Sequence, residues 1–144
     1  MTDLTFTVEF YFSTFIYLIE VFLIPYHWRG AGMWMHAEIP TVCDIALAAL
    51  CNVSVNVDTN QVSEITSDDL DTIVNAMRAH QNVEDIQRKS LILLKNLSFS
   101  RTNIMVMEQN PFLVPLIRSA RSTWQIDFEG RVDYLLHVLF AVNQ

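Results

Sequence analysis

The side chains best suited to bind another molecule are two asparagines that recur 44 residues apart in the same local setting. Asn52 lies in the sequence Leu-Cys-Asn-Val-Ser at residues 50–54, and Asn96 lies in Leu-Lys-Asn-Leu-Ser at residues 94–98. A side-chain amide offers a hydrogen-bond donor and an acceptor together. The alternative is that both amides only cap their helices or satisfy nearby backbone groups.

Residue types that carry catalysis or bind metals are present but scattered. The four histidines, at positions 27, 36, 80 and 137, include no pair at metal-ligand spacing, and neither cysteine has a partner at CxxC spacing. The pairs Asp68/Asp69 and Glu84/Asp85 stand near expected helix starts, where carboxylates are ordinarily structural. The sequence contains no glycine-rich phosphate loop, nucleophile elbow or HExxH motif. We therefore expect no enzyme activity, no metal site and no cofactor.

The two cysteines, Cys43 and Cys51, do not suggest a disulfide. On one helix they would lie about 12 Å apart along the axis, at about 1.5 Å per residue, and a disulfide needs Cα atoms within about 7 Å. We interpret both as small buried residues in a reducing compartment. This interpretation predicts an intracellular, cytoplasmic protein.

The charge of the chain argues against nucleic acid as a partner. The formal net charge is −7, and up to Met77 ten acids stand against one base, Arg29. From Arg78 onward there are eight bases and six acids, without a basic run. An acidic chain of this kind repels phosphate. The hydrophobic content of 51% is enough for a core, and 3 Gly and 4 Pro argue against an all-β design.

Residues 1–40 form an N-terminal unit with three open interpretations. Residues 4–24 are strongly apolar and long enough to cross a bilayer. Glu9 and Glu20 count against a membrane span. A signal peptide would need a basic residue before its apolar segment, and this chain has none there. The segment is a membrane-spanning or membrane-associated helix, a buried helix packed on the next ones, or a non-native leader. In the first case the chain is a membrane-associated protein with a helical soluble domain. Residues 25–40 are expected to be a linker.

Residues 41–144 are expected to be all-α, with helices joined by loops that include a polar, acidic one at 58–67. Apolar residues recur at spacings of three and four within segments at 41–57, 67–79, 83–99, 112–120 and 132–142, with a brief helix at 103–108. Ser67 is the expected N-cap of the second segment, with Asp68 and Asp69 in the first turn. The residues expected to face the core are Val42, Ile45, Ala46, Ala49, Leu50, Val53, Leu70, Ile73, Val74, Met77, Ile86, Leu91, Leu94, Leu97, Leu113, Val114, Leu116, Ile117, Leu135, Leu136, Leu139 and Val142.

The spacing of the recurrence lies in the range of stacked helical repeats, about 40–47 residues. The clearest stretch holds Asn-Leu-Ser at 96–98, then Asn103, Met-Glu-Gln-Asn-Pro-Phe at 107–112, and Leu-Val-x-Leu-Ile at 113–117. This pattern resembles an armadillo repeat. The resemblance covers residues 41–144 and implies an α-solenoid of about two to three armadillo-like repeats. The chain departs from the family at residues 109–111, Gln-Asn-Pro, where a glycine usually separates the first two helices.

The resemblance also implies a binding site. In armadillo proteins the third helices line a concave groove, where an Asn in a Leu-x-Asn-Leu pattern often hydrogen-bonds the backbone of an extended peptide. Asn52 and Asn96 match that Asn, and Ala48, Ile92 and Lys95 lie within a turn of them. Importin-α-like proteins carry a Trp four residues before the Asn. Ala48 and Ile92 stand there in this chain, so recognition of basic nuclear signals is not expected.

By resemblance, then, the chain is a non-enzymatic protein–protein interaction module, a scaffold whose partner is a protein or peptide. In the third apolar segment, 132–142, the position that matches Asn52 and Asn96 is Ala141, so the series of asparagines ends there. With Ala48 and Ile92 the groove should prefer an extended or helical apolar segment over a basic peptide, and Lys95 should favour an acidic ligand. We expect a piece of a longer array or a truncated member, poorly stable alone. The apolar last run, 132–142, is expected to self-associate.

Overall fold

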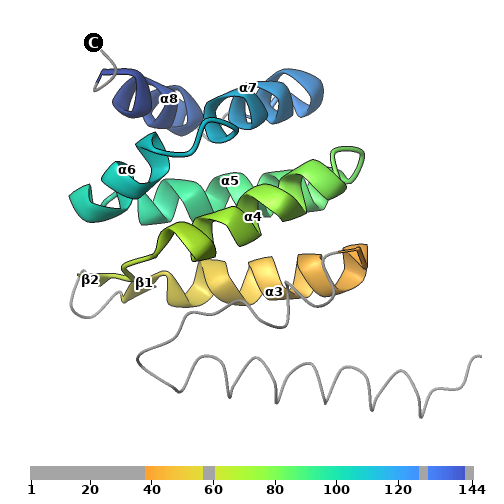
Figure 1. Ribbon diagram of the computed structural model, residues 1–144. Helices are drawn as coiled ribbons and strands as arrows, with labels where there is room; N and C mark the ends of the chain where they lie inside the picture. Colours follow the sequence, from red (N-terminus) through yellow and green to blue (C-terminus); the bar gives the residue numbers. More distant parts are fainter. Residues whose placement is uncertain (1–37, 57–60, 127–129, 142–144) are drawn as a thin grey trace, which may run out of the picture.

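A computed structural model describes residues 38–56, 61–126 and 130–141, and these residues are mostly helical (Figure 1). Their helices are α3 Pro40–Val53, α4 Ser67–Ala79, α5 Glu84–Leu97, α6 Arg101–Glu108, α7 Leu113–Trp124 and α8 Arg131–Ala141. Within the same residues the strands are β1 Val55–Asn56 and β2 Gln61–Val62, a short antiparallel pair. The predicted all-α class is confirmed. The apolar run at 4–24 and the linker up to residue 37 lie outside the described residues.

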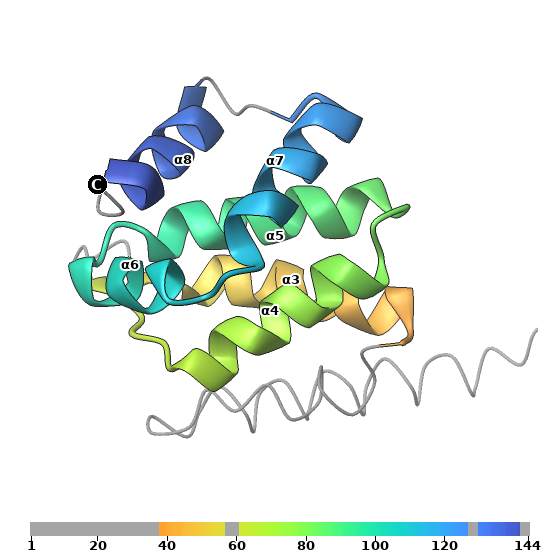
Figure 2. The ribbon, with the colours of Figure 1, turned by 45° about the horizontal axis from the view of Figure 1, so that its top comes forward.

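The helices are stacked in the order in which they occur along the chain (Figures 1 and 2). Helix α3 lies at one end, α4 and α5 form the middle layer, and α7 and α8 form the layer at the other end. The short helix α6 joins the last two layers at one side. Helix α5 is the centre of the stack, because it packs against α3, α4, α7 and α8.

Helix α4 spans the predicted residues 67–79, but its N-cap lies one residue earlier than predicted. The N-cap is Thr66 and not Ser67, because Thr66 and Asp69 form a reciprocal capping box. The Thr66 hydroxyl accepts the Asp69 N–H at 3.3 Å, and an Asp69 carboxylate oxygen accepts the Thr66 N–H at 2.8 Å. Two orphan N–H groups of the helix start are thereby satisfied. Asp69 is therefore a structural carboxylate.

Two other predicted boundaries are wrong by four residues each. The predicted helix 41–57 ends at Val53, and Val55 then pairs with Val62 in the short ladder, so the predicted loop at 58–67 contains a strand. Helix α7 continues one turn past the predicted end at residue 120 and reaches Trp124. It stops where Gln125 adopts a left-handed conformation with φ 51°, the conformation that commonly ends helices.

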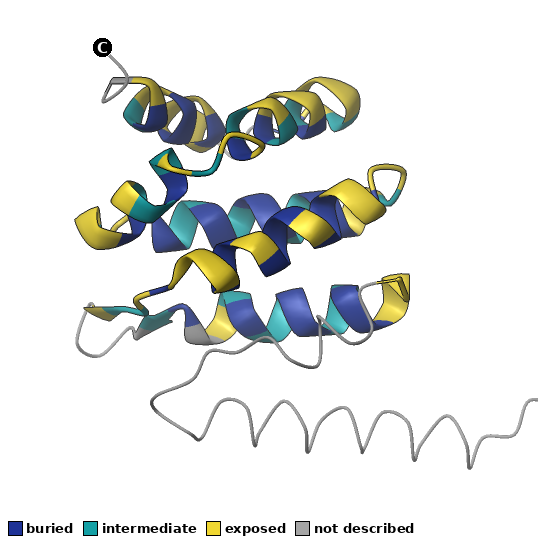
Figure 3. Ribbon diagram, viewed as in Figure 1, coloured by how far each residue is buried: buried dark blue, intermediate teal, exposed yellow. Residues whose placement is uncertain are grey.

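The core agrees closely with the predicted inward faces (Figure 3). The predicted residues of α4, α5 and α8 within the described range are all buried, as are Val42, Ala46, Leu50, Leu113 and Ile117. Ile45, Ala49, Val114 and Leu116 are only half-buried. The side chains of Val53 and Val142 lie outside the described residues. Burial is concentrated in α5, whose five leucine and isoleucine side chains at 86, 91, 93, 94 and 97 are 0% exposed.

The apolar residues of helix α8 are more deeply buried than the predicted self-association of segment 132–142 assumes. Leu135, Leu136 and Leu139 face the core, and the outer side carries charged residues beside Tyr134 and Phe140. Of the described helices, none combines the length and apolar character that crossing a membrane requires.

Candidate functional site

The five predicted groove residues lie on two helices that pack side by side, α3 and α5. Asn52 is exposed near the end of α3, and Ala48 is half-buried one turn earlier. Ile92, Lys95 and Asn96 are half-buried on one side of α5. Positions three and four apart share a helix face, so each helix presents its predicted residues together. We call this surface the α3–α5 face, defined by Ala48, Asn52, Ile92, Lys95 and Asn96.

The Asn96 amide connects α5 to the end of α3. Its Nδ2 donates to Ser54 Oγ at 3.1 Å and to the Cys51 carbonyl at 3.4 Å. The last carbonyls of a helix have no partner inside the helix, so the amide supplies one from the neighbouring helix. Asn96 thus has a structural function, as the alternative interpretation allowed, but its partners lie on the neighbouring helix and not in its own. Within the described residues no donor contacts its Oδ1, which leaves that acceptor available to a ligand.

Two further contacts hold the same pair of helices together. Lys89 Nζ lies 2.5 Å from Asp44 Oδ1, with about a third of each side chain exposed. The Cys51 thiol donates to the Lys89 carbonyl at 3.3 Å. Polar contacts therefore join α5 to α3 both near the start of α3, at Asp44, and at its end, at Cys51 and Ser54.

The electrostatic environment explains the behaviour of two groups beside this face. Burial raises the pKa of the Cys51 thiol from 9.0 to about 11, against the opposing effect of the Lys89 and Lys95 charges. Cys51 is therefore a protonated donor at neutral pH and a poor nucleophile. Partial burial lowers the pKa of Lys95, and the charge of Arg131 lowers it further. A carboxylate near Lys95 would relieve this repulsion.

A second asparagine, Asn103 on α6, has a structural role that sequence reasoning did not assign. It is 0% exposed, and its Oδ1 accepts the Ile65 N–H at 3.0 Å. Its Nδ2 donates to the carbonyls of Ser63 at 2.8 Å and Leu97 at 3.0 Å. The sequence signal that could have indicated this role is the position of Asn103, five residues after the Asn-Leu-Ser sequence at 96–98. Asn103 ties the segment before α4 to the end of α5.

Among the residues that the structure describes, no three His, Cys, Asp or Glu side chains gather where they could hold a metal ion. Comparisons of the chain with family models, with curated proteins and with solved structures find no match. The functional proposal is therefore based on the contacts of the described residues.

Proposed function

We propose that this chain is a protein–protein interaction module built as an armadillo-like α-solenoid. The observation that supports it is a set of polar contacts between layers, each joining residues about one repeat apart. Asp44 pairs with Lys89 across 45 positions, Ser54 with Asn96 across 42, and Gln81 with Trp124 across 43. Asn103 bonds Ser63 across 40 positions. Armadillo and HEAT repeats are about 40–47 residues long, so the contacts follow that period.

The ends of α3 and α5 also correspond to each other in detail. The Ser54 hydroxyl donates to the Cys51 carbonyl at 2.8 Å, and the Ser98 hydroxyl donates to the Lys95 carbonyl at 2.6 Å. Both members of the second pair lie 44 residues after those of the first. This match supports the assignment of α3 and α5 as the same helix of consecutive repeats. Stacked repeats of this kind present extended surfaces for binding other proteins.

The partner in this proposal is a protein or peptide that lies along the α3–α5 face. In this proposal the exposed amide of Asn52 and the open acceptor of Asn96 would form hydrogen bonds with backbone groups of such a segment. Ala48 and Ile92 offer a small apolar surface, and Lys95 offers a positive charge. A partly apolar segment that carries a carboxylate suits these groups better than a basic peptide.

The test is capture of partners from a cell lysate by the full tagged chain and by two variants, Asn52→Ala and Lys95→Glu. Asn82→Ala is the matched control, because Asn82 is an exposed asparagine in the turn between α4 and α5. A partner held by this face should bind Asn52→Ala about fivefold more weakly, since one lost hydrogen bond costs about 1 kcal/mol. Lys95→Glu should weaken the binding of this partner more than Asn52→Ala does. Equal capture by all four proteins would overturn the proposal.

A further inference from the structure

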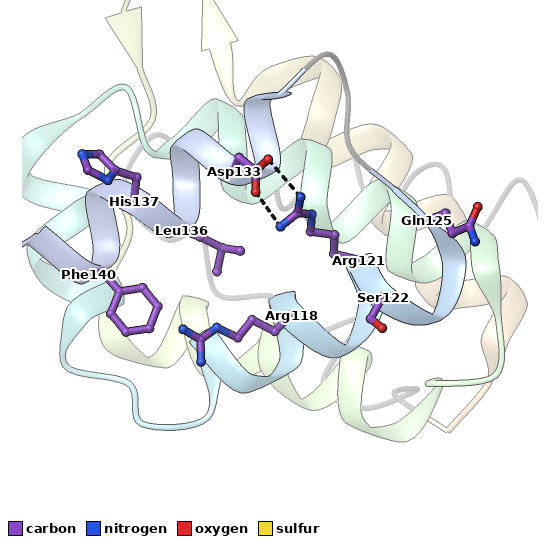
Figure 4. A pocket seen from close by; sticks show the side chains of 8 residues that line it. All are labelled: Arg118, Arg121, Ser122, Gln125, Asp133, Leu136, His137 and Phe140. Atoms are coloured by element: carbon purple, nitrogen blue, oxygen red, sulfur yellow. Dashed lines mark hydrogen bonds and ion pairs between the residues drawn. The ribbon is translucent and has the colours of Figure 1, made fainter.

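A pocket of about 640 Å³ opens between α7 and α8, and no residue of the α3–α5 face lines it (Figure 4). It belongs to the last layer of the stack, whose outer surface is largely exposed (Figure 3). Ligand pockets commonly occupy about 300–1,000 Å³. Apolar surface is supplied by Leu136, which points into the space between the helices, and by the Phe140 ring.

Among the described residues, the charged groups of this pocket leave one cation, Arg118, without a carboxylate. Arg121 is paired with Asp133 through two contacts, at 2.5 Å and 2.9 Å. Arg118 instead extends over the Phe140 ring, with its guanidinium carbon 4.3 Å from the centroid (Figure 4). Within the described residues no carboxylate pairs with Arg118. Stacking occupies the flat face of a guanidinium and leaves its edge N–H groups free to donate.

The preceding layer shows how unusual this surface is within the stack. The residues 44 positions before Arg118 and Arg121 are Val74 and Met77 on α4. Both are buried, at 2% and 0% exposure, and α4 packs against α7 of the next layer. Where α4 has apolar residues, α7 therefore carries two arginines. Covering an unpaired arginine with an apolar helix would be costly, so an occupant of this surface needs a carboxylate.

We infer that the α7–α8 pocket binds a peptide segment of a partner protein that combines an acidic side chain with an apolar one. The carboxylate would receive hydrogen bonds from the edge of the Arg118 guanidinium, which the Phe140 ring already holds in place. The apolar side chain would lie on Leu136 and the exposed part of Phe140. Charge complementarity selects an acidic occupant, because Asp133 neutralises Arg121 while the positive charge of Arg118 has no carboxylate partner among the described residues. The inference rests on the proposed function in taking the layers as equivalent repeats.

The test uses a synthetic helical peptide of twelve residues with capped ends and with Glu and Leu on one face. A second peptide with Gln in place of each Glu is its matched control. Binding to the full chain is followed by fluorescence anisotropy. We expect the Glu peptide to bind at least about tenfold more tightly than the Gln peptide, since hydrogen bonds to charged groups are about twice as strong as neutral ones. Equal binding of the two peptides would overturn the inference.

Three variants locate the site on the protein. Arg118→Glu should reduce binding of the Glu peptide at least about tenfold, and Arg118→Lys should give an intermediate loss because the planar fork is gone. Arg101→Glu is the control, because Arg101 is exposed on α6 and does not line the pocket. Arg118 is itself exposed, so its substitution should leave the circular dichroism spectrum unchanged.

The outcomes also separate this inference from the proposed function. Lys95→Glu lies on the α3–α5 face and should leave peptide binding unchanged if the pocket is the site. If Lys95→Glu abolishes binding and Arg118→Glu does not, the pocket inference is wrong and the α3–α5 face is supported. Arg118→Glu could instead abolish peptide binding while Asn52→Ala and Lys95→Glu leave the capture of partners from lysate unchanged. That result would support the pocket inference and contradict the proposal for the α3–α5 face.

Discussion

The ends of α3 and α5 carry the same sequence pattern but use its asparagine in different ways. Asn96 at the end of α5 donates to Ser54 and Cys51 at the end of α3. Asn52 at the end of α3 is exposed, and no earlier layer covers it within the described residues. An asparagine at this place ties its helix to the layer before it, or faces solvent where the described stack begins. The position of the helix in the stack therefore determines what the same residue does.

The largest effect is expected at Asn103, whose contacts join the chain segments that follow α3 and α5. Asn103→Ala would leave the buried Ile65 N–H without its partner and would remove the hydrogen bonds that the Asn103 amide donates to the carbonyls of Ser63 and Leu97. We expect the free energy of unfolding to fall by about 2–4 kcal/mol, because unsatisfied buried groups cost about 1–3 kcal/mol each. Urea unfolding measures this change. Asn82→Ala is the control, and a loss as small as the control's would contradict the role assigned to Asn103.

The next effect tests the comparison directly. Asn96→Ala should lower the free energy of unfolding by about 1 kcal/mol, the typical contribution of a hydrogen bond. Asn52→Ala should change it by less than about 0.5 kcal/mol, as is usual for surface sites. A double-mutant cycle with Ser54→Ala should return a coupling energy only for Asn96. Equal losses at the two asparagines would mean that their roles do not differ.

The ion pair between Asp44 and Lys89 should contribute less. Asp44→Asn is expected to cost about 0.5 kcal/mol, because a third of each side chain is exposed and such pairs are weak. The loss should disappear at about 1 M salt, where the screening length is near 3 Å. Glu84→Gln, which removes the partner of Arg88 within α5, is the matched control. A loss that salt does not reduce would show that Asp44 acts through packing instead.

The smallest effect at neutral pH is expected for Cys51→Ser, and it should grow in alkali. Because burial raises the Cys51 pKa from 9.0 to about 11, the folded protein keeps the thiol proton between those values while the unfolded chain releases it. The unfolded state then binds fewer protons, so stability falls as pH rises through this window. Urea unfolding from pH 8 to 11 should show a shallower decline for Cys51→Ser. Parallel curves would contradict the raised pKa.

The helices and their inward faces were predictable because periodic apolar residues carry that information locally. Ile73 and Met77 on α4 and Leu91 and Leu94 on α5 are buried as their spacing predicts. The errors lie where the local signal is weak. The β1–β2 pair is two residues per strand and has no measurable period, and the last turn of α7 holds the polar residues 121–123 between Ala120 and Trp124.

The candidate sites were predictable only in part, since they depend on contacts between distant segments. The sequence identified Asn52 and Asn96 by their recurrence, but it could not show that the Asn96 amide already contacts Ser54. The serine that recurs with the asparagine, at 54 and 98, was the available signal for that contact. The α7–α8 pocket was not predicted, because Arg118 and Phe140 belong to different helices and only their packing brings them together.

The order of the stack has a consequence for how the chain folds. Within the described residues, polar contacts such as Cys51 to Lys89 and Asp44 to Lys89 join neighbouring layers across 38 and 45 positions. Segments therefore meet after closing short loops, which costs little chain entropy and permits fast folding. Helix α5 contacts α3, α4, α7 and α8, so folding should start at the α4–α5 hairpin and spread in both directions to the ends of the stack.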